Sequence, residues 1–357
     1  MPDRPVKYVY ADCAASAPIL PYAFEAISEA TLLGGDNRVY GLGNPNSAHR
    51  PGRESRNILE NARRTIARCI NAKPEQIAFT PSATAACRYA MDYLGVRHCS
   101  PYEHKSVADH APAGRKRLEP GMRVFNPYAH MLANNETGEI YYGKVRELAQ
   151  KYSVFTDATA AVGQIPVDVQ DLGVAALAAG GHKFGGYPGI GFIYVRGGVK
   201  DDDTFPGTPP VALAVAMAYA LEYRTEHMDE ANEYLAEQYS LLMDRIMEIP
   251  GAYFTVGKSI VHLANILSVR FDGVNARELL TMLDVNGVYA SAGSACTADQ
   301  DEPSRTLLAS GLTREQALST IRLSFCPETT REEFDFVAET LRLCVARVRA
   351  LNRAHTL

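Results

Sequence analysis

The sequence predicts an α/β protein, in which a large domain with a mostly parallel mixed sheet precedes a smaller α+β domain. From residue 76 onward, short apolar segments alternate with segments of helical spacing, which is typical of a parallel sheet covered by helices on both faces. Polar residues directly follow several predicted strands, as they do where such sheets bind ligands. A long helical stretch at 211–247 then leads into a shorter region of strands and helices. The 357 residues are enough for both domains.

The elements of the large domain follow from the spacing of apolar residues. Strand-like runs lie at residues 6–10, 76–80, 96–99, 122–125, 130–133, 153–156, 174–179 and 190–195. Helical spacing occurs at residues 22–33, 53–70, 85–94 and 144–151. Residues 41–49 form a Gly/Asn-rich loop that fits neither a helix nor a strand, and polar loops of this kind often line a site.

The smaller domain is expected at residues 251–357, after a large domain at 17–250, with residues 1–16 joining the smaller domain. Its predicted strands and helices have the pattern of an α+β unit. The strands are expected at 266–271, 288–291 and 320–325, and the helices at 276–283 and 331–351.

Composition excludes several classes of function. The net charge is −5, and acidic and basic residues are mixed without a basic tract, so neither nucleic acid nor a membrane surface is an expected partner. No apolar run reaches the length of a membrane-spanning helix, and the first seven residues lack the apolar core of a signal peptide. The seven cysteines are scattered without a CxxC pair, which predicts a reducing cytoplasm and neither a disulfide framework nor a zinc site.

Five polar residues share one placement, because each lies just after a predicted strand. They are Thr84, His104, Asn135, Asp157 and Lys183. In an open α/β sheet, ligands bind beyond the carboxyl ends of the strands. We therefore expect these side chains to form one site.

Lys183 is the centre of this expected site. It stands between the apolar run 174–179 and a strand at 190–195, with small residues around it. A partly desolvated lysine amine is neutral often enough to form a Schiff base with a carbonyl, and small neighbours leave room for a flat cofactor. The alternative for a lysine taken alone is a surface loop residue.

Three parts of this expected site have both a functional and an ordinary interpretation. Ser82 to Thr84 precede a helix, so their free N–H groups could bind a phosphate, or Ser82 could simply cap the helix. Asp157 could keep a pyridine nitrogen protonated, or it could cap a helix. His104 could stack on a cofactor ring and move protons, or it could be structural.

Two residues of the smaller domain are candidates for contact with a substrate. Cys296 is presented by the small-residue loop 291–297, where it could act as a mobile nucleophile or be a small buried residue. Arg322 lies on an apolar strand and needs a partner, which could be a substrate carboxylate or a structural ion pair.

The combination of these motifs resembles the pyridoxal-phosphate-dependent cysteine desulfurases, which have the class V aminotransferase fold of the PLP-dependent transferases. The similarity extends from Asp12 to Ser324 and keeps the order of the motifs. The motifs are Glu103-His104-Lys105, Asn134-Asn135-Glu136, Asp157-Ala158-Thr159, Gly181-His182-Lys183 and Ser294-Ala295-Cys296-Thr297.

The resemblance implies pyridoxal 5'-phosphate as the cofactor and assigns roles around it. The implied cofactor-binding residues are Ala83, Thr84, His104, Asn135, Asp157, His182, Lys183 and Thr208. Lys183 would bind the aldehyde, Asp157 would pair with the ring nitrogen, and His104 would stack on the ring. Asn135 would contact the ring hydroxyl, and the phosphate would lie against Ala83, Thr84 and His182.

The resemblance also implies the substrate, the products and the partners. Arg322, with Asn44, would hold the carboxylate of L-cysteine, and Cys296 would attack its sulfur, leaving L-alanine and a persulfide. A sulfur-acceptor protein would then receive the sulfur. Thr208 would reach the phosphate of the neighbouring subunit, which implies a homodimer. The long loop around Cys296 resembles the branch that serves iron–sulfur cluster assembly and tRNA thiolation.

Some positions depart from the family pattern. Ala160 stands where the family has Gln, Gly180 stands where it has Ser, and the stretch around Phe205 lacks an Arg. Residues 85–87 are apolar or a thiol where polar residues are expected, and the segments 104–135 and 183–208 are short. Each lost polar contact would weaken binding by roughly 1 kcal/mol. The alternatives are therefore another enzyme of this fold, either an aminotransferase or a lyase acting on an amino acid such as selenocysteine, and a catalytically weakened sulfur-transfer scaffold.

Overall fold

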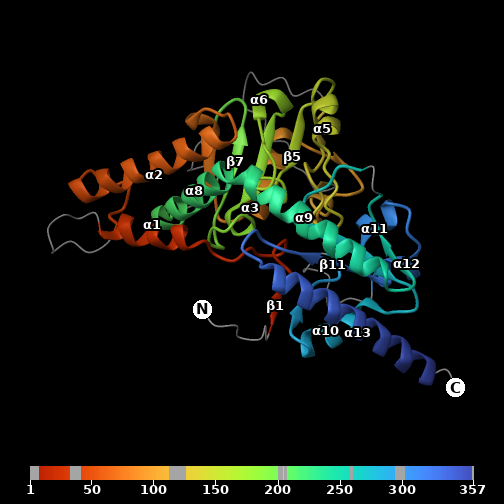
Figure 1. The fold of residues 1–357 in the computed structure, drawn as a ribbon. Coiled ribbons are helices and arrows are strands. Elements are labelled where there is room, and N and C mark those ends of the chain that lie inside the picture. The colour runs from red at the N-terminus through yellow and green to blue at the C-terminus, as the bar shows by residue number, and fades with distance from the viewer. Residues whose placement is uncertain are drawn as a thin grey trace. The chain divides into compact units, whose positions relative to one another are not determined.

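The computed structural model describes residues 8–32, 42–111, 126–199, 204, 207–257, 260–293 and 302–355 (Figure 1). The chain divides into two compact units. The large unit comprises residues 17–133 and 141–228, and the small unit comprises residues 1–16, 134–140 and 229–357.

A six-stranded mixed sheet forms the centre of the large unit. Its strands, in spatial order, are β2 (Ile77–Thr80), β7 (Gly191–Val195), β6 (Ala176–Gly180), β5 (Val154–Asp157), β4 (Tyr128–Ala129) and β3 (His98–Cys99). β7 pairs antiparallel with both β2 and β6, and the other pairs are parallel. Five of these strands therefore run in one direction, which confirms the expected mostly parallel sheet.

Two helices of the large unit precede its first strand, and helices alternate with the strands from β2 onward, as predicted. The helices are α1 (Pro21–Leu32), α2 (Arg50–Cys69), α3 (Ala83–Leu94), α4 (Lys105–Ala108), α5 (Tyr142–Ala149), α6 (Val169–Leu172) and α8 (Val211–Glu226), with 3-10 turns η1 (Pro74–Gln76) and η3 (Gly181–Lys183). β2, β5, β6 and β7 are buried along their whole length, as strands covered on both faces should be. α3 packs on β6 and β7, and α1, α2 and α8 pack together (Figure 1).

The small unit has two short sheets and its own apolar core. β8 (Ala252–Phe254), β9 (Ile266–Phe271) and β11 (Thr320–Ser324) form an antiparallel sheet, and β1 (Val9–Tyr10) pairs parallel with β10 (Val288–Tyr289). Its helices are α9 (Met228–Met247), α10 (Ala276–Val285), α11 (Arg305–Ala309), α12 (Arg314–Leu318) and α13 (Arg331–His355). Among the described helices of both units, none is long and apolar enough to cross a membrane.

Two expectations differ from the structure. The strand expected at 130–133 lies at Tyr128–Ala129, although the N–H groups of His130 and Leu132 still donate to carbonyl groups of β5. The chain turns only after this segment, where the Asn134 side chain accepts hydrogen bonds from the next backbone N–H groups. The boundary expected at residue 250 falls at residue 228, because Leu235, Leu242 and Ile246 of α9 belong to the core of the small unit. The strand expected at 122–125 lies outside the described residues.

Candidate active site

Four of the five expected site residues lie at one edge of the large sheet. Thr84 follows β2, His104 follows β3, Asp157 ends β5 and Lys183 follows β6. Since these four strands run in the same direction, their carboxyl ends meet at this edge. Asp157 and Lys183 are both close enough to act electrostatically on the His104 ring.

Lys183 ends the turn η3, which the sequence packs tightly. Gly185 has a φ of +94°, a conformation that favours glycine, and a Cβ at Gly186 would lie 3.0 Å from the carbonyl oxygen of Gly181. The N–H of Leu20 donates to the Gly185 carbonyl at 2.9 Å, which ties the turn to the segment before α1. Lys183 itself, at the end of this turn, is partly exposed.

The first turn of α3 is a suitable phosphate site. Ser82 caps the helix by accepting from the N–H of Ala85 at 3.1 Å. The N–H groups of Ala83 and Thr84 have no acceptor among the described residues and stand at the positive end of a 12-residue helix. The residues present therefore fit the phosphate of the implied cofactor.

Gly180 brings β6 against this helix end. A Cβ added to Gly180 would lie 3.0 Å from the Ala83 Cβ and 3.3 Å from the His182 Cε1. The absence of a side chain at Gly180 therefore lets the His182 ring lie beside the start of α3. A serine at this position would therefore crowd both neighbours.

We expect Gly180→Ser to lower the free energy of unfolding by about 1 kcal/mol, because the new atoms crowd two neighbours in a packed interior. Gly143→Ser on α5 is the matched control, since a Cβ at Gly143 meets nothing within 4 Å. Chemical denaturation of both variants without cofactor measures the difference. Equal stability of the two variants would show that Ala83 and His182 give way without cost.

The two histidines near Lys183 are held in their neutral forms. The backbone N–H of Ser106 donates to the His104 Nδ1 at 3.2 Å, so in the neutral ring Nε2 carries the proton. Burial lowers the pKa of His104, and Lys183 adds to this effect, while Asp157 opposes it. Burial and then Lys183 lower the pKa of His182 to about 4.

Asp157 has one oxygen engaged locally. Its Oδ1 accepts the backbone N–H of Thr159 at 3.0 Å, and the residue is 5% exposed. This bond closes a local turn. The described residues directly after Asp157 form no helix, so the helix-cap interpretation is wrong. The bond engages only one oxygen, and pairing of the other with a ring nitrogen remains a prediction. The Thr159 hydroxyl is buried and has no partner among the described residues.

Asn44 and Thr208, two residues expected to contact ligands, lie together in the large unit. The Asn44 Nδ2 donates to the Thr208 Oγ1 at 3.3 Å. Their expected contacts with a substrate carboxylate and with a partner subunit's cofactor remain predictions.

The small unit holds Arg322 and Asn135, and its contacts favour the ion-pair interpretation of Arg322. The Arg322 Nη2 lies 2.5 Å from the Asp12 Oδ1, and Nη1 donates to the Asn135 carbonyl oxygen at 2.7 Å. The arginine is 1% exposed, and its Nε has no partner among the described residues. Binding of a substrate carboxylate by Arg322 therefore remains a prediction. Cys296 and Phe205 lie outside the described residues.

Sequence reasoning assigned no role to three residues that the structure connects to the expected site residues. Asp12 pairs with Arg322, and Ser106 bonds to His104. Glu103 is a buried acid directly before His104. The signals were present, because an arginine on an apolar strand needs a counter-ion and Glu103 stands in a motif with His104.

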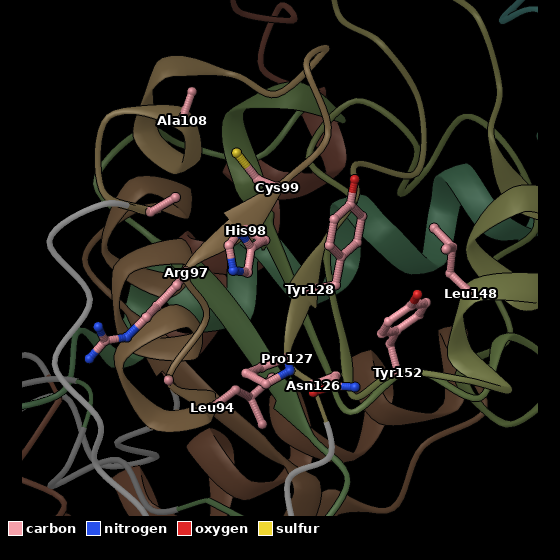
Figure 2. A pocket seen from close by; sticks show the side chains of 12 residues that line it. Leu94, Arg97, His98, Cys99, Ala108, Asn126, Pro127, Tyr128, Leu148 and Tyr152 are labelled. Carbon is pink, nitrogen blue, oxygen red and sulfur yellow. The ribbon is translucent and has the colours of Figure 1, made fainter.

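A cavity of about 1000 Å³ lies beside β3, the outermost strand on one side of the six-stranded sheet of the large unit (Figure 2). Its lining includes His98 and Cys99 of β3 together with Tyr128 and Tyr152. None of the residues expected to bind cofactor or substrate lines it.

Comparison with known proteins identifies the family. The family model described as Aminotransferase class-V matches residues 9–106, 116–202 and 200–337. The chain is 31% identical to an IscS-like cysteine desulfurase of Mycobacterium tuberculosis, with 95% of this chain and 97% of that protein covered. It is 32% identical to a cysteine desulfurase IscS of Proteus mirabilis, with 96% and 94% covered.

Solved structures agree with the sequence relatives. A NifS-like protein matches with a TM-score of 0.81 at 26% identity, covering 95% of this chain and 100% of that one. A structure described as SspA in complex with cysteine matches with a TM-score of 0.70 at 25% identity, covering 89% and 99%. This chain therefore belongs to the class-V aminotransferase family, among its pyridoxal-phosphate-dependent cysteine desulfurases.

Proposed function

We propose that the protein is a cysteine desulfurase that uses pyridoxal 5'-phosphate to remove sulfur from L-cysteine. The substrate's carbon–sulfur bond breaks, L-alanine is released, and the sulfur remains as a persulfide on Cys296 for an acceptor protein. The observation that carries the proposal is the single sheet edge where Lys183, Asp157 and His104 meet beside the free N–H groups of α3. The compartment would be the cytoplasm, and the assembly a homodimer.

The residues of the sheet edge would divide the work of binding. The N–H groups of Ala83 and Thr84, with the neutral His182, would hold the phosphate. The Asp157 carboxylate would keep a proton on the pyridine nitrogen. When bound, pyridoxal phosphate supplies the electron sink for the pair of electrons left by the departing α-proton.

The remaining steps would depend on proton transfer and on one nucleophile. Lys183 would bind the cofactor's aldehyde carbon and, once displaced by the substrate amine, could move a proton at the substrate's Cα. The neutral ring of His104, with its proton on Nε2, could stack on the cofactor or exchange a proton. The Cys296 thiolate would take the sulfur.

We expect Cys296→Ala to keep the cofactor's absorbance band while alanine formation from cysteine falls at least about 100-fold. The reason is that the variant lacks the thiol that takes the sulfur from the substrate. Absorbance spectra and alanine release measure the two effects. Cys69→Ala is the control, since this partly buried thiol lies on the surface helix α2.

Different results would favour the alternatives. Unchanged turnover in Cys296→Ala would contradict the role of this thiol. A cofactor band that cysteine alters without releasing alanine would indicate an aminotransferase or a lyase acting on another amino acid. A protein that binds no cofactor would be a scaffold.

A further inference from the structure

Glu103 joins two strand ends beside the proposed active site. It follows β3, directly precedes His104 and is only 6% exposed. Its Oε1 accepts two hydrogen bonds, from the Ser100 hydroxyl and from the backbone N–H of Met131, both at 2.6 Å. Ser100 follows β3 and Met131 follows β4, so this one carboxyl group connects neighbouring strands where the sheet edge is formed.

The second oxygen of Glu103 makes this contact unusual. Oε2 is buried and has no hydrogen-bond partner among the described residues. The titratable groups that act on Glu103 or on which it acts are Asp157 of β5, Cys87 of α3 and Tyr128 of β4, and none of these carries a positive charge. A buried carboxylate with no cation beside it is costly, so the protonated acid is the favoured form.

The pKa of Glu103 is shifted in the direction that this geometry predicts. Burial raises the pKa of Glu103 to about 8, with a smaller contribution from the charge of Asp157. The hydrogen bonds from Ser100 and Met131 oppose the shift. At neutral pH, Glu103 is therefore mainly a neutral acid.

The contact reaches the cofactor-binding residues through the backbone. The N–H of His130 donates to the Phe155 carbonyl at 3.0 Å, and the N–H of Leu132 donates to the Asp157 carbonyl at 2.9 Å. Met131 lies between these two donors. Glu103 thus holds the loop that carries His104 against the segment that is bonded to the end of β5.

We propose that Glu103 is a positioning residue. As a neutral acid, it holds the loop that carries His104 in place relative to the end of β5, where Asp157 lies. Loss of its proton loosens this arrangement. The inference rests on the proposed function, because it is this arrangement that would place His104 over a ring paired with Asp157. An ionised Glu103 would face the charge of Asp157 without a counter-ion, so the loop would open toward water.

The stability of the protein without cofactor tests the neutral state. Because the pKa of Glu103 rises from 4.5 to about 8 on folding, its contribution to stability is complete below pH 4.5 and is lost as the pH rises to about 8. Glu103→Gln keeps a neutral group of the same shape and cannot lose a proton. The melting temperature of this variant relative to wild type should therefore rise between pH 5 and pH 8.

Glu147→Gln is the matched control for this experiment. Glu147 lies exposed on α5, and hydrogen bonds from Lys144 and Lys151 lower its pKa. Its replacement should give a small difference of the opposite sign or none. Parallel pH dependences of wild type and Glu103→Gln would overturn the inference.

Cofactor affinity tests the positioning role. If only the protonated form of Glu103 is competent to bind, the affinity of wild type for pyridoxal phosphate should fall about tenfold between pH 7 and pH 9 relative to that of Glu103→Gln. Glu103→Ala should bind at least about tenfold more weakly than Glu103→Gln at pH 7. The cofactor itself also titrates in this pH range, but this affects wild type and Glu103→Gln equally. The ratio of the two affinities therefore reports on Glu103 alone.

The outcomes separate the inference from the proposed function. Equal affinities of Glu103→Gln and Glu103→Ala, with no change in the ratio to wild type between the two pH values, would overturn the positioning role. Failure of wild type to bind the cofactor at either pH would overturn the proposed function and with it the positioning role. The melting curves need no cofactor, so they alone decide whether Glu103 is neutral in the folded protein.

Discussion

We expect Lys183→Ala to lose the absorbance band at the edge of the visible range that wild type shows with pyridoxal phosphate, and to form alanine from cysteine at least about a thousandfold more slowly. Lys183 is placed at the end of β6, where its charge already acts on His104 and His182. An alanine leaves the N–H groups of the proposed phosphate site on α3 intact but removes the only amine expected to bind the aldehyde. The affinity for the phosphate should therefore fall less than the activity does.

The fold should survive this change, which makes the result interpretable. Lys183 is partly exposed, and substitutions of this kind usually change the free energy of unfolding by less than about 1 kcal/mol. Lys144→Ala, on the surface of α5, is the control for the loss of a lysine charge. A Lys183→Ala protein that keeps the band and turns over cysteine would contradict the central assignment.

Local sequence patterns were enough to predict several strands of both units. The apolar runs at 153–156 and 174–179 became β5 and β6, and the strand expected at 266–271 in the smaller domain became β9 (Ile266–Phe271). Each is long or apolar enough for its own residues to determine the structure. The placement of polar residues after strands also predicted that Thr84, His104, Asp157 and Lys183 lie at one edge of the sheet, because parallel strands share one edge. The fifth expected residue, Asn135, belongs to the small unit.

The remaining features depend on contacts that are distant along the sequence. β1 has two residues and pairs with β10, which lies more than 270 residues later, so no local pattern could indicate its partner. The boundary at residue 228 depends on which core α9 packs into, although helical spacing alone is the same in either case. The partner of Arg322 is another such case, since Asp12 lies 310 residues away.

Breaking the Arg322–Asp12 pair should destabilise the small unit more than most single substitutions. Arg322→Ala leaves the Asp12 carboxylate without its counter-ion and the Asn135 carbonyl without its donor. The side chain of Arg322 is only 2% exposed, so water cannot easily replace these contacts. Removal of one member of a buried ion pair costs about 3–5 kcal/mol. Denaturant unfolding without cofactor measures the loss, and a cost under about 1 kcal/mol would contradict the structural role.

A double replacement separates that structural role from the predicted contact with the substrate carboxylate. Asp12→Leu with Arg322→Met removes both charges and keeps apolar volume, so most of the stability lost in Arg322→Ala should return. If the guanidinium also holds the carboxylate of cysteine, kcat/KM should stay at least about tenfold below wild type despite the restored fold. Full recovery of kcat/KM would show that Arg322 serves only to pair with Asp12, and the carboxylate of the substrate would then need another partner. The alanine variant alone could not distinguish these cases, because a small unit that unfolds loses activity for either reason.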